Sequence, residues 1–320
     1  MRIVFEEVTF FGSPYERDMN AITVTPVGYA LGAAITGVNL TKPLNASNKE
    51  QICEAWQKHL VLVFPDQQLS PEQMLEFTSS FGKLDPNDAA PYYRDPTHTE
   101  ILIVTNKPLY GKPSETATAG TSWHSDRTYT LRPTKASFLL CKEKPPVGGD
   151  TIFTNMYLAY ETLSRPFQEF LDKLEAIHDV SLVKGLDKRD PEKVAAMKKL
   201  NPPVMHKVVQ THPETGRKSL FVGQRIRSFV GMTDAESAPI LAFLNQHAIS
   251  LEFTYRHNWS LNDLLMWDNR CTMHIAVPNY DKSRIRYMLR TALLGDEIGR
   301  RFEEAVKTEV SIEKEIAAVS

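Results

Sequence analysis

The sequence has few of the features that mark disulfide-rich, secreted or membrane proteins. It contains only three cysteines, Cys53, Cys141 and Cys271, which are widely spaced and form no C-x-x-C pair. This pattern argues against a disulfide framework or a thiolate metal site and fits a reducing cytoplasm. No stretch approaches the roughly 18 apolar residues of a membrane span, and residues 1–20 hold only a short apolar run. We therefore expect an untargeted cytoplasmic protein.

An excess of charge of one sign is also lacking. The 37 Lys and Arg residues are balanced by 39 Asp and Glu residues, which gives a net charge of -2. No overall basic field recruits nucleic acid or an anionic membrane, so any anion-binding site must be local. What the chain does contain is ample apolar material, 42% of 320 residues, for a substantial core. Because repeats and linkers are absent, we expect one domain over 1–320.

Strand-like segments occupy both ends of the chain, and helices are expected mainly between them. Apolar and β-branched runs predict strands within 22–40, 60–65, 101–105, 134–141, 151–154, 205–211, 218–222 and 253–294. Helical spacing and capping residues predict helices over 48–59, 71–81, much of 157–180, 190–200 and 234–248. We expect a helical insertion at about 157–200. The Pro- and Gly-containing segment of about 85–121 is predicted to be a lid, with a solvated insertion as the alternative.

The most informative stretch is Trp123-His124-Ser125-Asp126-Arg127. If it is a strand, His124 and Asp126 point to the same face and can converge on one ion. The pair alone is a weak signal, because both residue types are common in loops. A second histidine, His274, follows Trp267-Asp268-Asn269-Arg270 and completes the set if two remote strands lie side by side. Two imidazoles and one carboxylate form the face used by non-haem Fe(II) oxygenases.

Two arginines follow in the apolar run Arg286-Tyr287-Met288-Leu289-Arg290. In a strand, Arg286 and Arg290 share one face, and burying both is costly unless anions meet them. A guanidinium binds a carboxylate through two parallel hydrogen bonds. The pair is therefore a candidate receptor for small organic anions, although surface or salt-bridged arginines remain the alternative.

Taken together, these motifs resemble the taurine / 2,4-dichlorophenoxyacetate dioxygenase family of Fe(II)- and 2-oxoglutarate-dependent enzymes. The resemblance covers about 22–296. It is carried by the order of His124-Ser125-Asp126, Gly148-Gly149-Asp150-Thr151, Trp267-Asp268-Asn269-Arg270, His274 and the 286–290 strand, and by Thr36-Gly37-Val38-Asn39-Leu40 and Phe64-Pro65-Asp66-Gln67 near the N-terminus.

This resemblance implies a mainly β fold with inserted helices, the double-stranded β-helix or jelly roll. It implies that His124, Asp126 and His274 bind Fe(II), and that Arg286 and Thr151 hold the distal carboxylate of the cosubstrate 2-oxoglutarate. The implied reaction uses O2 to hydroxylate a substrate C–H bond while 2-oxoglutarate yields succinate and CO2. A homodimer or homotetramer is common in the family.

The substrate is expected to be a small organic anion. Arg290 suggests a carboxylate, sulfonate or sulfate ester, and an aryloxyalkanoate-like compound is preferred. Taurine is disfavoured as a substrate, because the loop after Phe81-Gly82-Lys83-Leu84 lacks the histidine that taurine enzymes of the family use. Further charge and aromatic contacts to substrate are expected from Arg127, Tyr92, Tyr93 and Tyr110.

Two other classes remain open. A zinc-type metallohydrolase could use the same His-Asp-His set to activate water, but it leaves the paired arginines without a role. A non-catalytic jelly-roll binding protein would not need a complete ligand set. Succinate formation that requires iron and O2 distinguishes the oxygenase from both.

Overall fold

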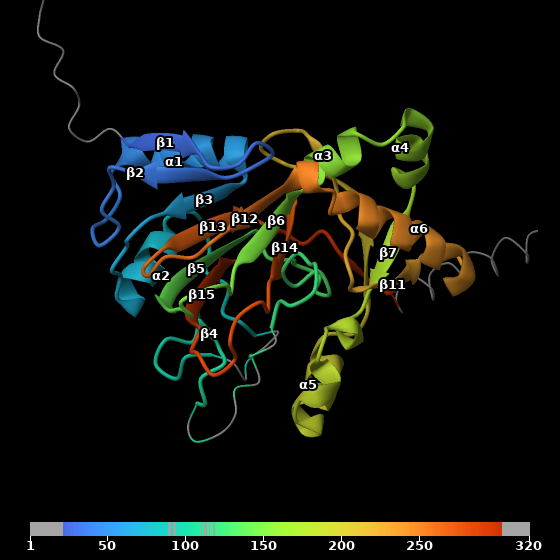
Figure 1. Ribbon diagram of the computed structural model, residues 1–320. Coiled ribbons are helices and arrows are strands. Elements are labelled where there is room, and N and C mark those ends of the chain that lie inside the picture. The colour runs from blue at the N-terminus through green and yellow to red at the C-terminus, as the bar shows by residue number, and fades with distance from the viewer. Residues whose placement is uncertain are drawn as a thin grey trace, which may run out of the picture.

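Sheets organise the structure, which a computed structural model describes over residues 22–88, 91, 94–109, 111, 114, 116–117 and 119–302 (Figure 1). In the largest sheet the strand order is β1-β2-β3-β13-β5-β15-β4, and all neighbours are antiparallel except β2 and β3. The strands are β1 (Thr23–Pro26), β2 (Ala33–Thr36), β3 (Val61–Phe64), β13 (Leu264–Asp268), β5 (Ala136–Glu143), β15 (Tyr287–Leu293) and β4 (Leu102–Thr105).

Smaller sheets complete the described part of the chain. The three-stranded sheet has the order β12-β6-β14, and the four-stranded sheet has the order β11-β7-β8-β16. A hairpin joins β9 and β10, as predicted for 205–222. The strands are β6 (Thr151–Asn155), β7 (Glu175–His178), β8 (Val204–Lys207), β9 (Val209–Thr211), β10 (Lys218–Leu220), β11 (Ile226–Phe229), β12 (Thr254–His257), β14 (Thr272–Ala276) and β16 (Arg300–Arg301).

The predicted helix starts lie within two residues of the observed ones. Ser70 and Thr233 each form a capping box with the Gln or Glu three residues later, which satisfies backbone N–H groups of the first turn. No described helix has the length and apolar character needed to cross a membrane. The helices are α1 (Ala46–His59), α2 (Pro71–Ser79), α3 (Met156–Glu161), α4 (Arg165–Leu171), α5 (Pro191–Leu200) and α6 (Asp234–Ala248), with short 3-10 turns η2 (Val180–Leu182), η3 (Leu186–Lys188) and η4 (Leu251–Phe253).

The helical prediction for 157–180 is wrong in its second half. Helix α4 ends at Leu171, and strand β7 begins at Glu175. Residues Ala176 and Ile177 are buried in the sheet between β11 and β8, so pairing on both sides decides the conformation. Tertiary packing of this kind overrides local propensity.

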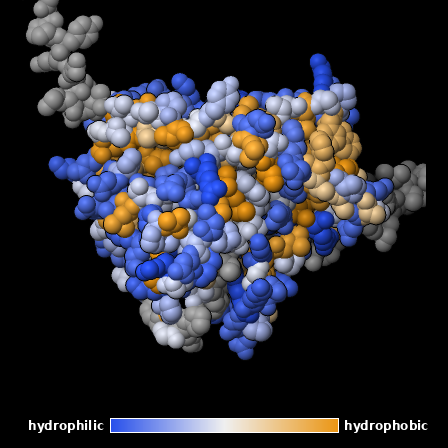
Figure 2. Space-filling view, viewed as in Figure 1, coloured by the Kyte–Doolittle hydropathy of each residue, from blue (hydrophilic) through white to orange (hydrophobic). Residues whose placement is uncertain are grey.

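Hydrophobic side chains cover both faces of the largest sheet. On one face α1 and α2 pack against it, and the ring centroids of Phe64 and Phe77 are 5.3 Å apart. On the other face Phe153 of β6 meets Trp267 of β13, with centroids 5.4 Å apart, so the three-stranded sheet faces the larger one across this layer. Figure 2 shows a mixed surface with hydrophobic residues gathered over α4 and part of α6, where Phe170 and Phe243 are exposed.

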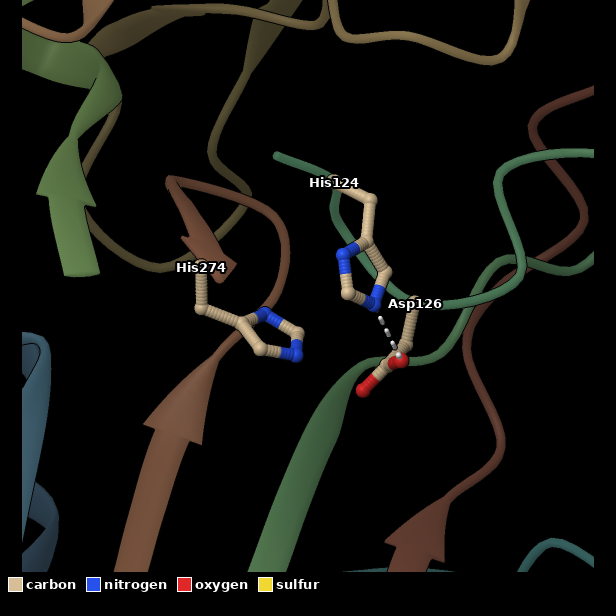
Figure 3. A group of neighbouring side chains, drawn as sticks. All are labelled: His124, Asp126 and His274. Carbon is tan, nitrogen blue, oxygen red and sulfur yellow. Dashed lines mark ion pairs between the residues drawn. The ribbon is translucent and has the colours of Figure 1, made fainter. Parts of the chain in front are cut away.

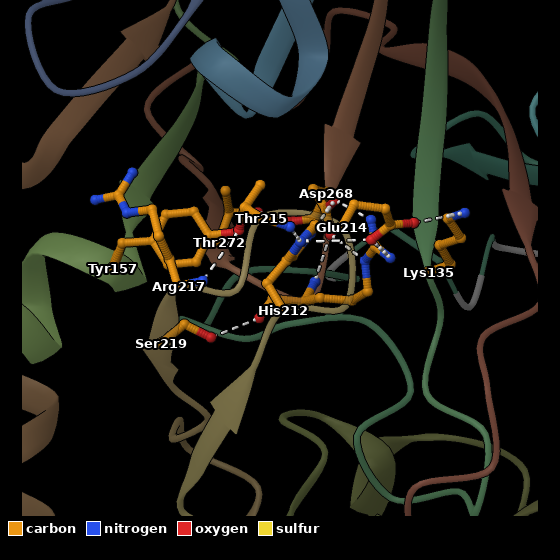
Figure 4. Close-up of polar contacts among 10 residues, drawn as sticks. Lys135, Tyr157, His212, Glu214, Thr215, Arg217, Ser219, Asp268 and Thr272 are labelled. Carbon is orange, nitrogen blue, oxygen red and sulfur yellow. Dashed lines mark hydrogen bonds and ion pairs between the residues drawn. The ribbon is translucent and has the colours of Figure 1, made fainter. Parts of the chain in front are cut away.

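A buried polar network fixes the turn between β13 and β14 (Figure 4). Asp268 accepts a 3.1 Å hydrogen bond from His212 Nε2 and bonds of 2.6 and 2.9 Å from Arg270. Arg270 also binds Glu214 at 2.6 Å. Burial alone would raise the pKa of Asp268, but Arg270 and His212 hold that pKa below its usual value. The network therefore ties the β9–β10 turn to the strand that carries His274.

We predict that Asp268→Asn lowers the free energy of unfolding by about 1–3 kcal/mol, because Arg270 loses one of its two carboxylate partners and keeps Glu214. Urea unfolding followed by circular dichroism measures the change. The control is Glu169→Gln on the exposed Arg165–Glu169 pair, which should change the free energy by less than about 1 kcal/mol.

The same substitution should change the response to acid. Because the pKa of Asp268 is lowered in the folded state, its contribution is fully present above the unfolded carboxyl pKa of about 3.9 and is lost as the pH falls below it. The difference between wild type and Asp268→Asn should therefore be constant from pH 5 to 7 and shrink on further acidification. A difference that grows toward low pH would contradict this assignment.

Candidate metal centre

His124 and His274 are joined through their backbones. His124 N–H donates to the His274 carbonyl at 3.1 Å, and His274 N–H donates to the His124 carbonyl at 2.8 Å. This antiparallel bridge confirms the prediction that the two remote segments lie side by side. The strand considered for 123–127 does not form, because only His124 pairs and a turn begins at Asp126.

The side chains of His124, Asp126 and His274 turn toward a common point (Figure 3). Their donor atoms lie within 4.8 Å of one another, and His124 Nε2 is 3.6 Å from Asp126 Oδ1. His124 Nδ1–H donates to the Ser122 carbonyl at 2.7 Å, which leaves the lone pair on Nε2 for a metal. Burial lowers the pKa of both histidines, so both rings are neutral and could act as metal ligands.

Asp126 is held so that one carboxylate oxygen stays available. Its Oδ2 accepts from Ser137 Oγ at 2.6 Å and from Arg290 Nη2 at 2.9 Å. Burial alone would raise the pKa of Asp126, but the Arg290 charge helps to hold it well below its usual value, so the carboxylate is ionised. Two neutral imidazoles and one carboxylate on one side of a point fit a divalent metal with open positions. The residues present therefore suit a non-haem Fe(II) ion.

A buried arginine without a counter-ion lies in the same cavity. Arg286 donates from Nε to the Gly149 carbonyl at 3.0 Å, while its buried Nη2 has no hydrogen-bond partner in the described structure. Nearby Asp150 binds Arg256 instead. Thr151 Oγ accepts from Trp259 Nε1 at 3.1 Å, so its proton can be donated into the cavity. These groups can bind a carboxylate.

The turn before Thr151 depends on two glycines. Gly148 and Gly149 have φ of 78° and 75°, a region that side chains rarely adopt. A Cβ at Gly148 would lie 2.1 Å from the Asn279 carbonyl oxygen. The predicted turn role of these residues is therefore confirmed, and the turn places the Gly149 carbonyl on Arg286.

The residues predicted to bind substrate have mixed positions. Arg290 and Arg127 both line the cavity, but both are engaged by the protein. Arg290 Nη2 binds Asp126, and Arg127 binds Asp85 at about 2.6 Å and Asn87 at 2.6 Å. Tyr92, Tyr93 and Tyr110 lie outside the described residues.

Sequence reasoning missed two residues of the site: Ser137, which binds Asp126 and Arg290, and Arg225, which lines the cavity. A serine inside the apolar strand β5 was a usable signal, because a buried hydroxyl needs a partner. Arg225 lies between β10 and β11, where no periodic pattern indicates the direction of a side chain.

The chain is similar to known dioxygenases over most of its length. The model of the taurine catabolism dioxygenase TauD, TfdA family matches residues 23–292. The alpha-ketoglutarate-dependent 2,4-dichlorophenoxyacetate dioxygenase of Cupriavidus pinatubonensis is 32% identical, with 87% of this chain and 99% of that protein covered. The alpha-ketoglutarate-dependent sulfate ester dioxygenase of Pseudomonas putida is also 32% identical, over 86% of this chain and 90% of that protein.

Solved structures agree. A taurine dioxygenase from Burkholderia xenovorans is 34% identical with a TM-score of 0.72, and 86% of this chain and 90% of that chain are covered. AAD-2 in complex with Mn(II) and N-oxalylglycine is 30% identical with a TM-score of 0.73, over 87% of this chain and 99% of that chain. A candidate metal-ligand face beside an arginine without a counter-ion thus occurs in a chain that matches these enzymes along its length, and the chain belongs to the TauD, TfdA family of 2-oxoglutarate-dependent dioxygenases.

Proposed function

We propose that His124, Asp126 and His274 bind Fe(II) and that the enzyme hydroxylates a C–H bond of a small organic anion. The observation that carries this proposal is the unpaired, buried Arg286 in the same cavity as the three donors. A zinc-type hydrolase would give this charge nothing to bind. Bound Fe(II) would supply O2 activation, coupled to conversion of 2-oxoglutarate to succinate and CO2.

Arg286 and Thr151 are proposed to bind the distal carboxylate of 2-oxoglutarate. The guanidinium keeps Nη2 free while Nε stays on the Gly149 carbonyl, and the Thr151 hydroxyl adds one donor. AAD-2 was solved with N-oxalylglycine, which carries two carboxylates like 2-oxoglutarate and supports the same arrangement here.

Arg290 and Ser137 are proposed to orient Asp126. Both bind Oδ2, so Oδ1 remains on the side of the two histidines. Arg290 Nη2 is thereby occupied, and the substrate contact expected of Arg290 falls to its other nitrogens. The substrate contacts expected of Arg127, Tyr92 and Tyr93 stay predictions. Apolar lining from Leu139 and Trp267 restricts water around the reacting atoms.

The proposal also covers the fold, the lid, the oligomeric state and the class of substrate. The largest sheet and the three-stranded sheet face each other across a shared core, which supports a jelly roll in a single domain. Residues 102–120 contribute several described side chains to the cavity wall, in keeping with a lid over 85–121. A cytoplasmic homodimer or homotetramer is part of the proposal. The substrate is proposed to be an aryloxyalkanoate or a sulfate ester, the compounds named for the two relatives.

We predict that the wild-type protein releases succinate only with Fe(II), 2-oxoglutarate and O2, and that Asp126→Ala loses Fe(II) binding. Asp126 is the only carboxylate of the ligand face. Its removal should lower the affinity for Fe(II) by more than the roughly 10- to 100-fold typical of substitutions at residues that only hydrogen-bond to a metal ligand. Calorimetric titration with Fe(II) under argon measures affinity without turnover. The control is Asp187→Ala, an exposed carboxylate outside the cavity. Iron-independent succinate release would refute the proposal.

Arg286→Ala should raise the KM for 2-oxoglutarate by roughly 10- to 100-fold, because a charge-assisted hydrogen bond to the cosubstrate is lost. The KM for the primary substrate should change far less. Steady-state succinate assays give both values. Arg284→Ala, an exposed arginine two residues earlier, is the control. The reverse ranking of the two KM values would mean that the roles of Arg286 and Arg290 are exchanged.

Ser137→Ala should weaken Fe(II) binding by roughly 10- to 100-fold while leaving the ligand set complete. The reason is that the Ser137 hydroxyl donates to Asp126 and accepts from Arg290 and Asn269, so its loss loosens the carboxylate. Calorimetric Fe(II) titration measures the effect, with exposed Ser260→Ala as the control. An affinity within twofold of wild type would show that Arg290 alone suffices.

A further inference from the structure

Arg225 carries a positive charge into the cavity without a carboxylate to balance it. It lies between β10 and β11 and lines the cavity beside the metal-ligand face. Its Nη1 donates to the Ser125 carbonyl at 3.2 Å, and its guanidinium lies 5.4 Å from the centre of the Tyr129 ring. Its buried Nε has no hydrogen-bond partner, and within the described residues it forms no ion pair.

Four other arginines line the cavity; Arg189 has interactions of its own, and the remaining three have assignments. Arg127 is bound by Asp85, and Arg290 is bound by Asp126. Arg286 lies at the Thr151 end of the cavity, where 2-oxoglutarate is proposed to bind. Arg225 is therefore available for a different anion.

The charge balance of the cavity also calls for an anion near Arg225. Asp126 is the one carboxylate among the described lining residues, and Arg290 already offsets it. A divalent ion, Arg286 and Arg290 would carry four positive charges against three negative charges on Asp126 and a dianionic cosubstrate, and Lys184 and Arg189 also line the cavity. The Arg225 charge would then remain uncompensated in a site where burial lowers its pKa.

Apolar side chains surround this guanidinium. Tyr129 and Met197 belong to one hydrophobic cluster, against which Val183 packs, and all three line the cavity. Figure 1 shows α5, which carries Met197, projecting from the main body of the molecule. A ligand at this wall would meet a cation at one point and an apolar surface beside it, which suits an organic anion rather than a free inorganic ion.

We infer that Arg225 binds the anionic group of the primary substrate, a carboxylate or a sulfate ester, while the apolar body of the substrate packs against Tyr129, Val183 and Met197. This inference rests on the proposed function, because it places the substrate beside the Fe(II) and 2-oxoglutarate sites. It assigns the main anion contact to a residue other than Arg290, which stays with Asp126.

The test is binding without turnover. Protein loaded with Mn(II) and N-oxalylglycine is titrated by calorimetry with 2,4-dichlorophenoxyacetate, with hexyl sulfate and with neutral 2,4-dichlorophenoxyacetamide. Arg225→Gln should weaken the anion that wild type binds by roughly 10- to 100-fold, as expected for a lost charge-assisted hydrogen bond, and should leave the amide unchanged. Arg225→Lys, which keeps the charge, should fall between. Arg227→Gln, the same change at an exposed position outside the cavity, is the matched control.

Each outcome has a separate meaning. Preference for the carboxylate or for the sulfate identifies the anionic group. Equal anion binding by wild type and Arg225→Gln, an equal loss for the amide, or no anion binding by loaded wild type would overturn the inference while the proposed function stands. Failure of wild type to bind N-oxalylglycine with Mn(II) would instead overturn the proposed function. Unchanged N-oxalylglycine affinity in each variant verifies that it is folded.

Discussion

The two backbone hydrogen bonds between His124 and His274 are the constraint on which the site depends. They join a loop near the middle of the chain to strand β14, so both imidazoles start from adjacent backbone positions. Strand β14 is itself fixed at both sides, by pairing with β6 and by the Asp268 network at its beginning. Asp126 needs only the turn that follows His124 to reach the same point. The candidate metal-ligand face is thus a product of sheet pairing, and its rigidity comes from the core behind it.

The arginines of the cavity differ in function because they differ in their partners. A guanidinium that already meets a carboxylate, as Arg127 meets Asp85, contributes to folding and has little left to offer a ligand. Arg290 is intermediate between these cases, since one of its nitrogens, Nη2, binds Asp126. Arg286 and Arg225 keep buried nitrogens without partners, which is costly unless a ligand supplies the acceptor. Such a cost is tolerated where function requires it.

Most helix starts and the three candidate metal ligands could be predicted from the sequence. Capping residues such as Ser70 indicated helix starts because their hydrogen bonds are local. The clustering of His124, Asp126 and His274 could be expected because metal binding restricts the residue types. The strand considered for 123–127 and the helix predicted for 175–180 were wrong, because both conformations depend on partners distant in the chain. Arg225 was missed for the same reason: its position is set by a loop, and its lack of a counter-ion is a property of the folded cavity alone.

The hydrogen bond from His124 to the Ser122 carbonyl links the shape of the cavity wall to the orientation of the His124 imidazole. Ser122 and Gly120 form part of the cavity wall, and the Gly120 carbonyl is fixed to Ala276 on β14. Any redesign that moves this wall to admit a larger compound also rotates the imidazole and redirects its lone pair. Changes of substrate range are therefore better sought at Val183 and Met197, which line the cavity and share no hydrogen bond with His124, Asp126 or His274 among the contacts described.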